Sequence, residues 1–252
     1  MTVGKPSTGL VRMIPTAITM AALVSGLLSI YASFQSLETA GEGTALHLRA
    51  ALLIMLAMIL DGLDGNAARL LNATSEIGGE LDTFVDLTAF GIAPAMLIYA
   101  SASGFPPVLR IALGCLLVAS GAYRLSRFKA VDPHRGQHGY LGLPITVCAA
   151  LTATAHILAI QAPASWGPLR FDLGGGPAGI GFLVLVVALA GLQVSRIHFP
   201  KPTKNPVFFV ISIIAVVLLF AGSPPLAAGS ALLMIVFGLY YILASPFLKS
   251  KG

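Results

Sequence analysis

The sequence predicts an all-α bundle of about eight transmembrane helices, with both termini on the cytoplasmic side. Of its 252 residues, 56% are hydrophobic and only 10% are charged, whereas a soluble domain carries about 25% charged residues. Five stretches contain no Asp, Glu, Lys or Arg, and each is long enough to cross a bilayer as a helix. The Lys and Arg residues between these stretches gather on one side. The first two observations predict a bundle in lipid, and the third predicts its orientation.

The hydrophobic runs define the predicted helices along the chain. Proline lacks the N–H donor that a continuing helix needs and is favoured at a helix start, so the Pro-Pro pair within residues 222–225 divides the last apolar run. The sequence contains no repeat and no soluble segment, so residues 1–252 are predicted to form a single membrane domain. The predicted helices cover about residues 13–34, 45–72, 78–102, 107–127, 141–162, 176–196, 206–222 and 226–247.

The basic residues are distributed unequally between the two ends of the predicted spans. Three of them, Arg49, Arg110 and Arg170, fall on one side, and twelve fall on the other. Because cytoplasmic loops are enriched in Lys and Arg, the side with twelve is predicted to face the cytoplasm, and an even number of spans then places both termini there. We therefore attribute the net charge of +5 to orientation in the cell (inner) membrane, and expect lipids rather than nucleic acid as partners. The twelve are Lys5, Arg12, Arg69, Arg124, Arg127, Lys129, Arg135, Arg196, Lys201, Lys204, Lys249 and Lys251.

Acidic residues are concentrated in one short segment, since six of the ten in the chain lie between residues 61 and 86. Asp61 and Asp64 are three apart and share one face of a predicted helix. Asp82 and Asp86 are four apart and share one face of the next helix. A short connection joins the two helices as a hairpin over residues 61–86, so we expect four carboxylates to meet near the cytoplasmic end of the bundle.

Four carboxylates at this depth need positive partners. Each costs about 2.5–3.5 kcal/mol inside a membrane, and their mutual repulsion adds to that cost. Arg69 offers one charge, whereas two divalent cations would balance all four carboxylates, and oxygen ligands suit Mg²⁺ or Mn²⁺. The alternative from charge alone is an ion path in a transporter, because acidic residues inside a membrane also mark such paths.

The spacing within this segment resembles the signature of the CDP-alcohol phosphotransferase family. The pattern is Asp-x-x-Asp-Gly-x-x-Ala-Arg from residue 61, then eight residues, then Gly-x-x-x-Asp-x-x-x-Asp from residue 78. One departure is Thr16 after Pro15, where the family often has Asn. Other stretches resemble the integral-membrane phosphatidylserine synthases within this family; they are residues 79–95, 123–129, 142–150 and 194–201.

The resemblance implies an enzyme that transfers the phosphatidyl group of CDP-diacylglycerol to the hydroxyl of L-serine, giving phosphatidylserine and CMP. It also implies that Asp61, Asp64 and Asp82 hold two metal ions, and that Asp86 is both a metal ligand and the general base. The enzymatic alternative is the same chemistry with glycerol 3-phosphate or inositol phosphate as acceptor. A transporter would show helix-breaking patterns in two related halves, which this sequence lacks. Because family members are usually homodimers, a homodimer is expected by analogy.

The resemblance also suggests residues that contact the CDP group. Gly65 and Arg69 occupy positions that contact it in the family. Ser75 falls where the family often has a hydroxyl that touches the nucleotide. Ser75 or Thr74 is equally suited to cap the second helix of the hairpin, so both roles are open.

Polar residues at the same end of the bundle are candidates for binding the acceptor. Arg124 and Arg127 are three apart at a helix end, and a guanidinium group matches the geometry of the serine carboxylate. Anchoring at the membrane surface explains these two residues equally well. Glu80 is a candidate for contact with the acceptor amine or for a hydrogen bond within the bundle.

Overall fold

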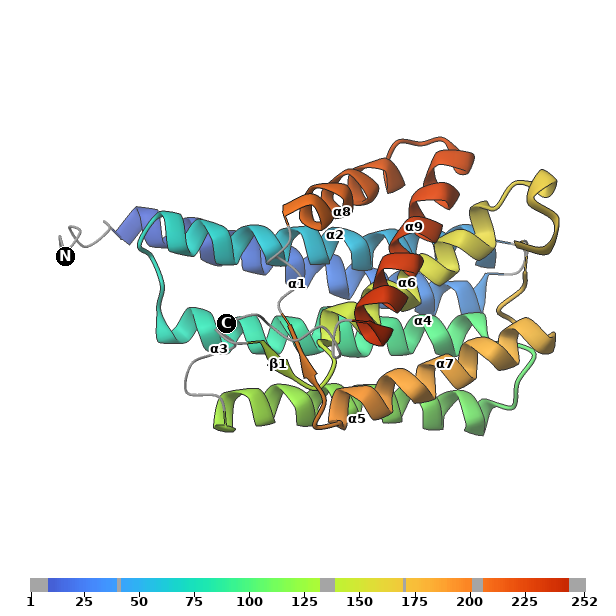
Figure 1. The fold of residues 1–252 in the computed structure, drawn as a ribbon, viewed down its shortest axis with the longest axis horizontal. Coiled ribbons are helices and arrows are strands. Elements are labelled where there is room, and N and C mark those ends of the chain that lie inside the picture. The colour runs from blue at the N-terminus through green and yellow to red at the C-terminus, as the bar shows by residue number, and fades with distance from the viewer. Residues whose placement is uncertain (1–8, 40–41, 132–138, 170, 201–205, 245–252) are drawn as a thin grey trace.

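The computed structural model describes residues 9–39, 42–131, 139–169, 171–200 and 206–244, and it confirms the predicted all-α membrane bundle (Figure 1). Helices suit a lipid environment because they satisfy their own backbone hydrogen bonds. The elements in chain order are α1 (Gly9–Glu38), α2 (Gly43–Leu70), α3 (Glu76–Asp86), the π-helix η1 (Leu87–Ile92), α4 (Ala93–Ser101), α5 (Pro107–Val131), β1 (Tyr140–Leu141), α6 (Ile145–Gln161), the 3-10 helix η2 (Ala164–Leu169), α7 (Gly176–Val194), β2 (His198–Phe199), α8 (Pro206–Leu219) and α9 (Pro224–Leu243).

Six stretches of helix within the described residues are long and apolar enough to cross a membrane. One of them consists of α3, η1 and α4 in unbroken succession. Two further apolar helices, α6 and α8, are shorter, with 17 and 14 residues. The predicted total of about eight spans and the cytoplasmic position of both termini therefore stay predictions. The six stretches are Met13–Glu38, Gly43–Leu70, Glu76–Ser101, Pro107–Ala130, Gly176–Val194 and Pro224–Leu243.

The structure corrects the start of the predicted helix at residues 141–162, which begins only at Ile145. The residues before it form β1, which pairs antiparallel with β2. Gly142 has a φ of 79°, and a Cβ atom there would collide with the carbonyl oxygen of Gln193. The left-handed backbone and this close approach both favour glycine and are incompatible with helix at this position.

Each helix packs against one or more neighbouring helices, and these contacts link the whole bundle. α1 packs along α2, α2 contacts α6, and α6 contacts α9. α4 packs against α1 and α5, and α5 packs against α7. In Figure 1, α1 and α2 lie above the rod formed by α3 and α4, and α5 and α7 lie below it. The core is apolar, and its largest fully buried side chains include Phe90, Ile54, Met55, Leu97 and Ile157.

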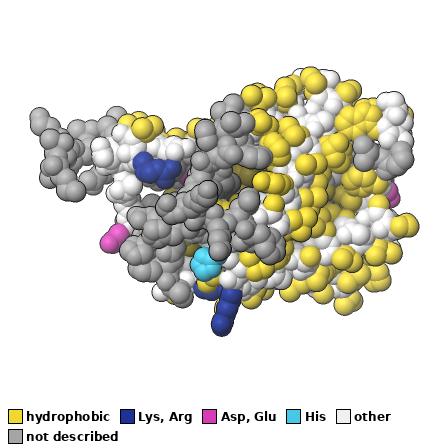
Figure 2. Space-filling model, in the orientation of Figure 1, with side chains coloured by type: hydrophobic (Ala, Val, Ile, Leu, Met, Phe, Trp, Pro, Cys, Tyr) yellow, Lys and Arg dark blue, Asp and Glu magenta, His cyan; other side chains and the backbone are white. Residues whose placement is uncertain are grey.

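The surface of the molecule agrees with a position in lipid. Hydrophobic side chains cover most of the right half of the face shown in Figure 2, whereas its Lys and Arg side chains lie toward the left. Large apolar side chains are exposed along the long helices, for example Tyr31 on α1, Val108 on α5 and Val184 on α7. An extensive exposed apolar surface is unusual on a soluble monomer and normal for helices that face acyl chains.

The α3–α4 rod changes its helical geometry directly after Asp86, the last residue of α3. The next six residues form η1. π-helical segments are rare in proteins, and those that occur often lie at functional sites. Helix α1 passes very close to this segment, because a Cβ atom added to Gly26 would lie 2.9 Å from the Cα atom of Ala89. Gly26 thus permits α1 to pack directly on the turn that follows Asp86.

Candidate active site

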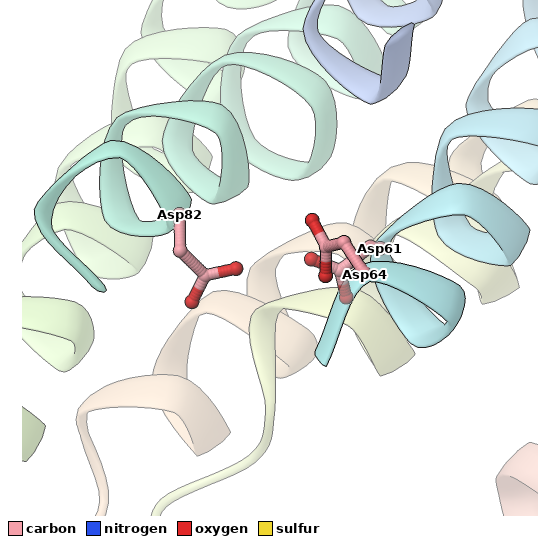
Figure 3. Close-up of side chains that lie close together, drawn as sticks. All are labelled: Asp61, Asp64 and Asp82. Carbon is pink, nitrogen blue, oxygen red and sulfur yellow. The ribbon is translucent and has the colours of Figure 1, made fainter. Parts of the chain in front are cut away.

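The hairpin formed by α2 and α3 brings three of the four predicted aspartates together. Asp61 and Asp64 lie in the last turns of α2, and Asp82 lies on α3 and points across the gap toward them (Figure 3). Each residue offers one carboxylate oxygen, and these atoms all lie within 4.8 Å of one another. This separation is short enough for one small cation to bridge the three side chains.

The charges in this cluster are only partly offset by basic side chains, since Lys129 acts on Asp82 from outside ion-pair distance. At a separation of 4.8 Å, two ionised carboxylates repel by about 3 kcal/mol at an effective dielectric constant of about 20. Among the described residues, no Lys or Arg forms an ion pair with Asp61, Asp64 or Asp82. An all-oxygen donor set with excess negative charge is the kind that holds Mg²⁺ or Mn²⁺, so the residues fit a divalent metal ion.

Asp86 lies one helical turn beyond Asp82 and is partly buried at the end of α3. It is not one of the three residues whose oxygens cluster. The negative charges of Asp61 and Asp82 act on it from one side, and the positive charge of Arg124 opposes them. Asp86 therefore lies within electrostatic range of both the acidic cluster and a buried arginine on α5.

A residue of α1 that the sequence analysis did not identify contacts this cluster. The hydroxyl of Thr19 lies 2.5 Å from Oδ2 of Asp64, to which it donates a hydrogen bond. Both side chains are buried, and the carbonyl oxygen of Pro15 lies 3.0 Å from the same hydroxyl. Threonine in a helix commonly bonds its own backbone in this way, so the sequence carried no signal for the contact with Asp64.

The three residues predicted to contact the CDP group lie around the α2–α3 connection. Ser75 caps α3, since its hydroxyl oxygen accepts a hydrogen bond of 3.0 Å from the backbone N–H of Gly78. Arg69 is exposed and donates to Oδ1 of Asn66 at 2.8 Å. A Cβ atom at Gly65 would lie 3.6 Å from a guanidinium nitrogen of Arg69, so Gly65 gives that side chain room. The cap predicted for α3 is present at Ser75, and the contacts with CDP stay predictions.

The two candidate arginines of α5 have different surroundings. Arg127 donates to four backbone carbonyl oxygens, at distances between 2.8 and 3.2 Å. Its guanidinium group thereby joins the end of α7 to β1, and most of its donors are occupied. The four acceptors are Leu141, Gln193, Val194 and Ser195.

Arg124, one turn earlier, is buried, and its Nε finds no hydrogen-bond partner among the described residues. Its guanidinium carbon lies 5.7 Å from the ring centre of Tyr140 and 6.0 Å from that of Phe128. Burial raises the pKa of the Tyr140 hydroxyl above its ordinary value, so this phenol stays protonated at neutral pH. Arg124 thus retains unused hydrogen-bonding capacity on the side of the bundle that holds Asp86.

Glu80, the candidate for the acceptor amine, forms an ion pair with Lys129. Their side-chain atoms are 2.7 Å apart, and the pair joins the first turns of α3 to the end of α5. The relative exposures of the Lys129 and Glu80 side chains are 35% and 67%, so water screens the pair. Of the two roles open for Glu80 from sequence, the structure contains the interaction within the bundle.

The comparisons with known proteins agree with this geometry. Residues 12–190, which include all four aspartates, match the family model described as CDP-alcohol phosphatidyltransferase. The chain is similar to proteins named CDP-diacylglycerol–serine O-phosphatidyltransferase. The one from Helicobacter pylori is 30% identical over 235 residues, 91% of this chain and 88% of that protein. The one from Bacillus subtilis is 31% identical over 193 residues, 76% and 92% of the two chains. The one from Methanocaldococcus jannaschii is 27% identical over 232 residues, 88% and 90% of the two chains.

Proposed function

The chain belongs to the CDP-alcohol phosphatidyltransferase family, and on that premise we propose that it transfers the phosphatidyl group of CDP-diacylglycerol to the hydroxyl of L-serine, releasing CMP. The observation that carries the proposal is the convergence of three carboxylates at the α2–α3 hairpin, with Asp86 one turn away. The names of relatives that match most of this chain support serine as the acceptor.

Two divalent metal ions, Mg²⁺ or Mn²⁺, are part of this proposal. Asp61, Asp64, Asp82 and Asp86 would hold them, and the first three already offer oxygens within 4.8 Å of one another. When bound, such ions neutralise the charge of the pyrophosphate and of the departing CMP. Gly65 and Arg69, next to the cluster on α2, are proposed to contact the CDP group, with Ser75 as a further candidate.

Asp86 is proposed as the general base. Its carboxylate accepts the proton of the serine hydroxyl, and the serine oxygen attacks the phosphorus that carries the diacylglycerol. A new phosphorus–oxygen bond forms to serine, the bond between this phosphorus and the CMP oxygen breaks, and CMP leaves with the released electron pair. Orientation of the two substrates and charge neutralisation supply most of the catalysis in reactions of this class.

Arg124 is proposed to bind the serine carboxylate, whereas Arg127 is proposed to be structural. Arg124 is buried, lies within electrostatic range of Asp86 and has an unpartnered Nε among the described residues. Arg127 already donates to four carbonyl oxygens and has little capacity left for a substrate. A single guanidinium near Asp86 matches one carboxylate better than it matches the dianion of a phosphorylated acceptor.

The proposal also includes the membrane location, the side of the membrane on which the active site lies and the oligomeric state. The six apolar helices support a multi-pass protein of the cell (inner) membrane. The basic residues near the α2–α3 hairpin support an active site on the cytoplasmic side. A homodimer is proposed by analogy with the family alone.

The test uses purified full-length protein with CDP-diacylglycerol and Mg²⁺ or Mn²⁺. Serine, glycerol 3-phosphate and inositol phosphate are supplied in turn, and CMP release is measured. We expect release with serine only, and we expect Asp86→Asn to lower it by about 10²–10⁴-fold because the general base is lost. Release with a phosphorylated acceptor instead of serine would refute the assignment of the acceptor.

A further inference from the structure

We propose that Thr19 is a positioning residue of the metal site, which makes α1 a part of that site. The proposal rests on the metal-binding role of Asp64 in the proposed function. Thr19 would not touch the metal ion or the substrate. Its hydroxyl would fix the orientation of the Asp64 carboxylate so that Asp64 can bind the same cation as Asp61 and Asp82.

The contact between these side chains is short and buried. The Thr19 hydroxyl oxygen lies 2.5 Å from Asp64 Oδ2, within the range of a hydrogen bond from a hydroxyl to an ionised carboxylate. Thr19 is 7% exposed and Asp64 5% exposed, so water does not compete for either group. Asp64 is the most buried of the three clustered aspartates. The hydroxyl therefore limits the rotation of the ligand that has least access to solvent.

The same hydroxyl is itself held in place by its own helix. The carbonyl oxygen of Pro15 lies 3.0 Å from it, one turn earlier on α1. Branching at Cβ restricts the χ1 angle of threonine in a helix, which limits where the hydroxyl can lie. The hydroxyl has one proton, and the shorter distance to Asp64 favours the carboxylate over the Pro15 carbonyl as its acceptor. Asp64 thus receives its hydrogen bond from a side chain of restricted rotation, which helps to orient a metal ligand.

Other hydroxyl groups on α1 separate this role from ordinary helix packing. Ser25 donates to the carbonyl oxygen of Leu53 at 2.8 Å, and Ser29 donates to that of Ala50 at 2.9 Å. These bonds also join α1 to α2, but their acceptors are backbone atoms away from the acidic cluster. Thr19 differs because its acceptor on α2 is the carboxylate of Asp64. Ser25 and Ser29 therefore provide matched controls for the loss of an interhelical hydrogen bond.

Loss of the Thr19 hydroxyl should weaken metal binding without removing a ligand. Hydrogen-bonding partners of metal ligands typically contribute about 10–100-fold in metal affinity or activity. Thr19→Val keeps the shape of the side chain and removes the donor. We expect it to raise the Mn²⁺ concentration for half-maximal effect by about tenfold, and Thr19→Ser to restore a value near that of the unmodified protein.

The test measures thermal stabilisation of the full-length protein by Mn²⁺ alone, without CDP-lipid or serine. A ligand that binds only the folded state stabilises it by RT ln(1 + [L]/Kd), so the Kd for Mn²⁺ fitted to this titration, its midpoint, reports metal binding independently of catalysis. Thr19→Val should shift the midpoint, whereas Ser25→Ala should lower the melting temperature in the absence of metal and leave the midpoint unchanged. If Thr19→Val does not fold, Thr19→Ala replaces it in the same titration.

Three results would overturn the proposal. An unchanged midpoint in the Thr19 variants would show that the hydroxyl only joins two helices. Equal midpoint shifts in Thr19→Val and Ser25→Ala would show that any loosening of α1 has the same effect. If Mn²⁺ fails to stabilise the unmodified protein, the metal site fails and the role of Thr19 fails with it. The choice of serine as acceptor is not touched by any of these outcomes.

Discussion

Two polar regions of this bundle differ in whether other residues of the protein supply their hydrogen-bond partners and their opposite charges. On α6, His156 is buried, and its two ring nitrogens lie 2.8 Å from the Ser101 hydroxyl and 2.7 Å from the carbonyl oxygen of Thr152. Its ring also packs edge-on against Phe182. At the α2–α3 hairpin, three carboxylates lie within 4.8 Å of one another without an ion-pair partner among the described residues.

The difference indicates which region is structural and which is functional. Buried polar groups are normally satisfied within the fold, and His156 follows this rule. Three neighbouring carboxylates without a counter-charge destabilise a fold unless something from outside completes them. We therefore propose that the acidic cluster binds a cation, whereas the contacts of His156 hold α4, α6 and α7 together.

The largest expected effect comes from removing one charge of the acidic cluster. Asp82→Asn should abolish metal-dependent stabilisation and lower CMP release by at least about 10²-fold, because a ligand is lost. In metal-free buffer the same change should raise the melting temperature by about 10 °C, because it relieves about 3 kcal/mol of repulsion and each kcal/mol shifts the melting temperature by about 3 °C in a chain of this size. CMP release and thermal melting in EDTA measure the two effects.

The matched control for this variant is Glu80→Gln, two residues earlier on the same helix. Glu80 is exposed and lies outside the three-carboxylate group, so both readouts should stay near those of the unmodified protein. A metal-free Asp82→Asn protein that melts at a lower temperature would contradict the proposed repulsion.

In the His156 region, a substitution is expected to lower stability and to leave activity unchanged. His156→Ala should destabilise the protein by about 3 kcal/mol, because it opens a cavity and leaves the Ser101 hydroxyl with only a long contact of 3.4 Å to the carbonyl oxygen of Ile98. CMP release per folded molecule should not change. Melting curves and activity normalised to folded protein measure this, and a selective loss of Mn²⁺ binding would refute the separation of the two regions.

Arg124 and Arg127 also differ in whether their hydrogen bonds are satisfied within the protein, and the expected effects of changing them are smaller. Arg124→Lys should raise the KM for serine by about tenfold, because lysine loses the bidentate geometry for a carboxylate, with the KM for CDP-diacylglycerol unchanged. Arg127→Lys should mainly lower the melting temperature, because lysine cannot hold the four carbonyl oxygens. Steady-state kinetics and thermal melting separate the two, and an exchange of these outcomes would reverse the assigned roles.

The smallest effect is expected at the Lys129–Glu80 ion pair. Lys129→Gln should change the free energy of unfolding by about 0.2–1 kcal/mol, since exposed pairs contribute little. The KM for serine should stay within a factor of about two, as expected for a residue that does not bind the acceptor. A large rise in that KM would make Glu80 a candidate for contact with serine again.

The sequence predicted the features that depend on local spacing and composition. Charge-free runs predicted the apolar helices, and the spacing of the aspartates predicted that Asp61, Asp64 and Asp82 meet across the hairpin, whereas Asp86 is not among the residues whose oxygens cluster. Ser75 was predicted as a cap from the preference of serine for that position, and it caps α3.

Features that depend on contacts distant in sequence were not predictable. Thr19 and Asp64 are 45 residues apart, and no local pattern links them. The strands β1 and β2 are two residues each, too short to leave an alternating pattern, so the start of α6 was placed too early. The different surroundings of Arg124 and Arg127 arise because the carbonyl oxygens of Leu141 and of the end of α7 lie beside Arg127, whereas Arg124 lies beside the rings of Tyr140 and Phe128.

The most direct test of the central claim is a count of the Mn²⁺ ions bound to purified protein, by calorimetric titration or electron paramagnetic resonance. We expect about two ions per chain, with binding strongly weakened in Asp61→Asn and unaffected in His156→Ala. An absence of Mn²⁺ binding, or the same binding after loss of Asp61, would contradict the claim that these aspartates converge to hold divalent cations.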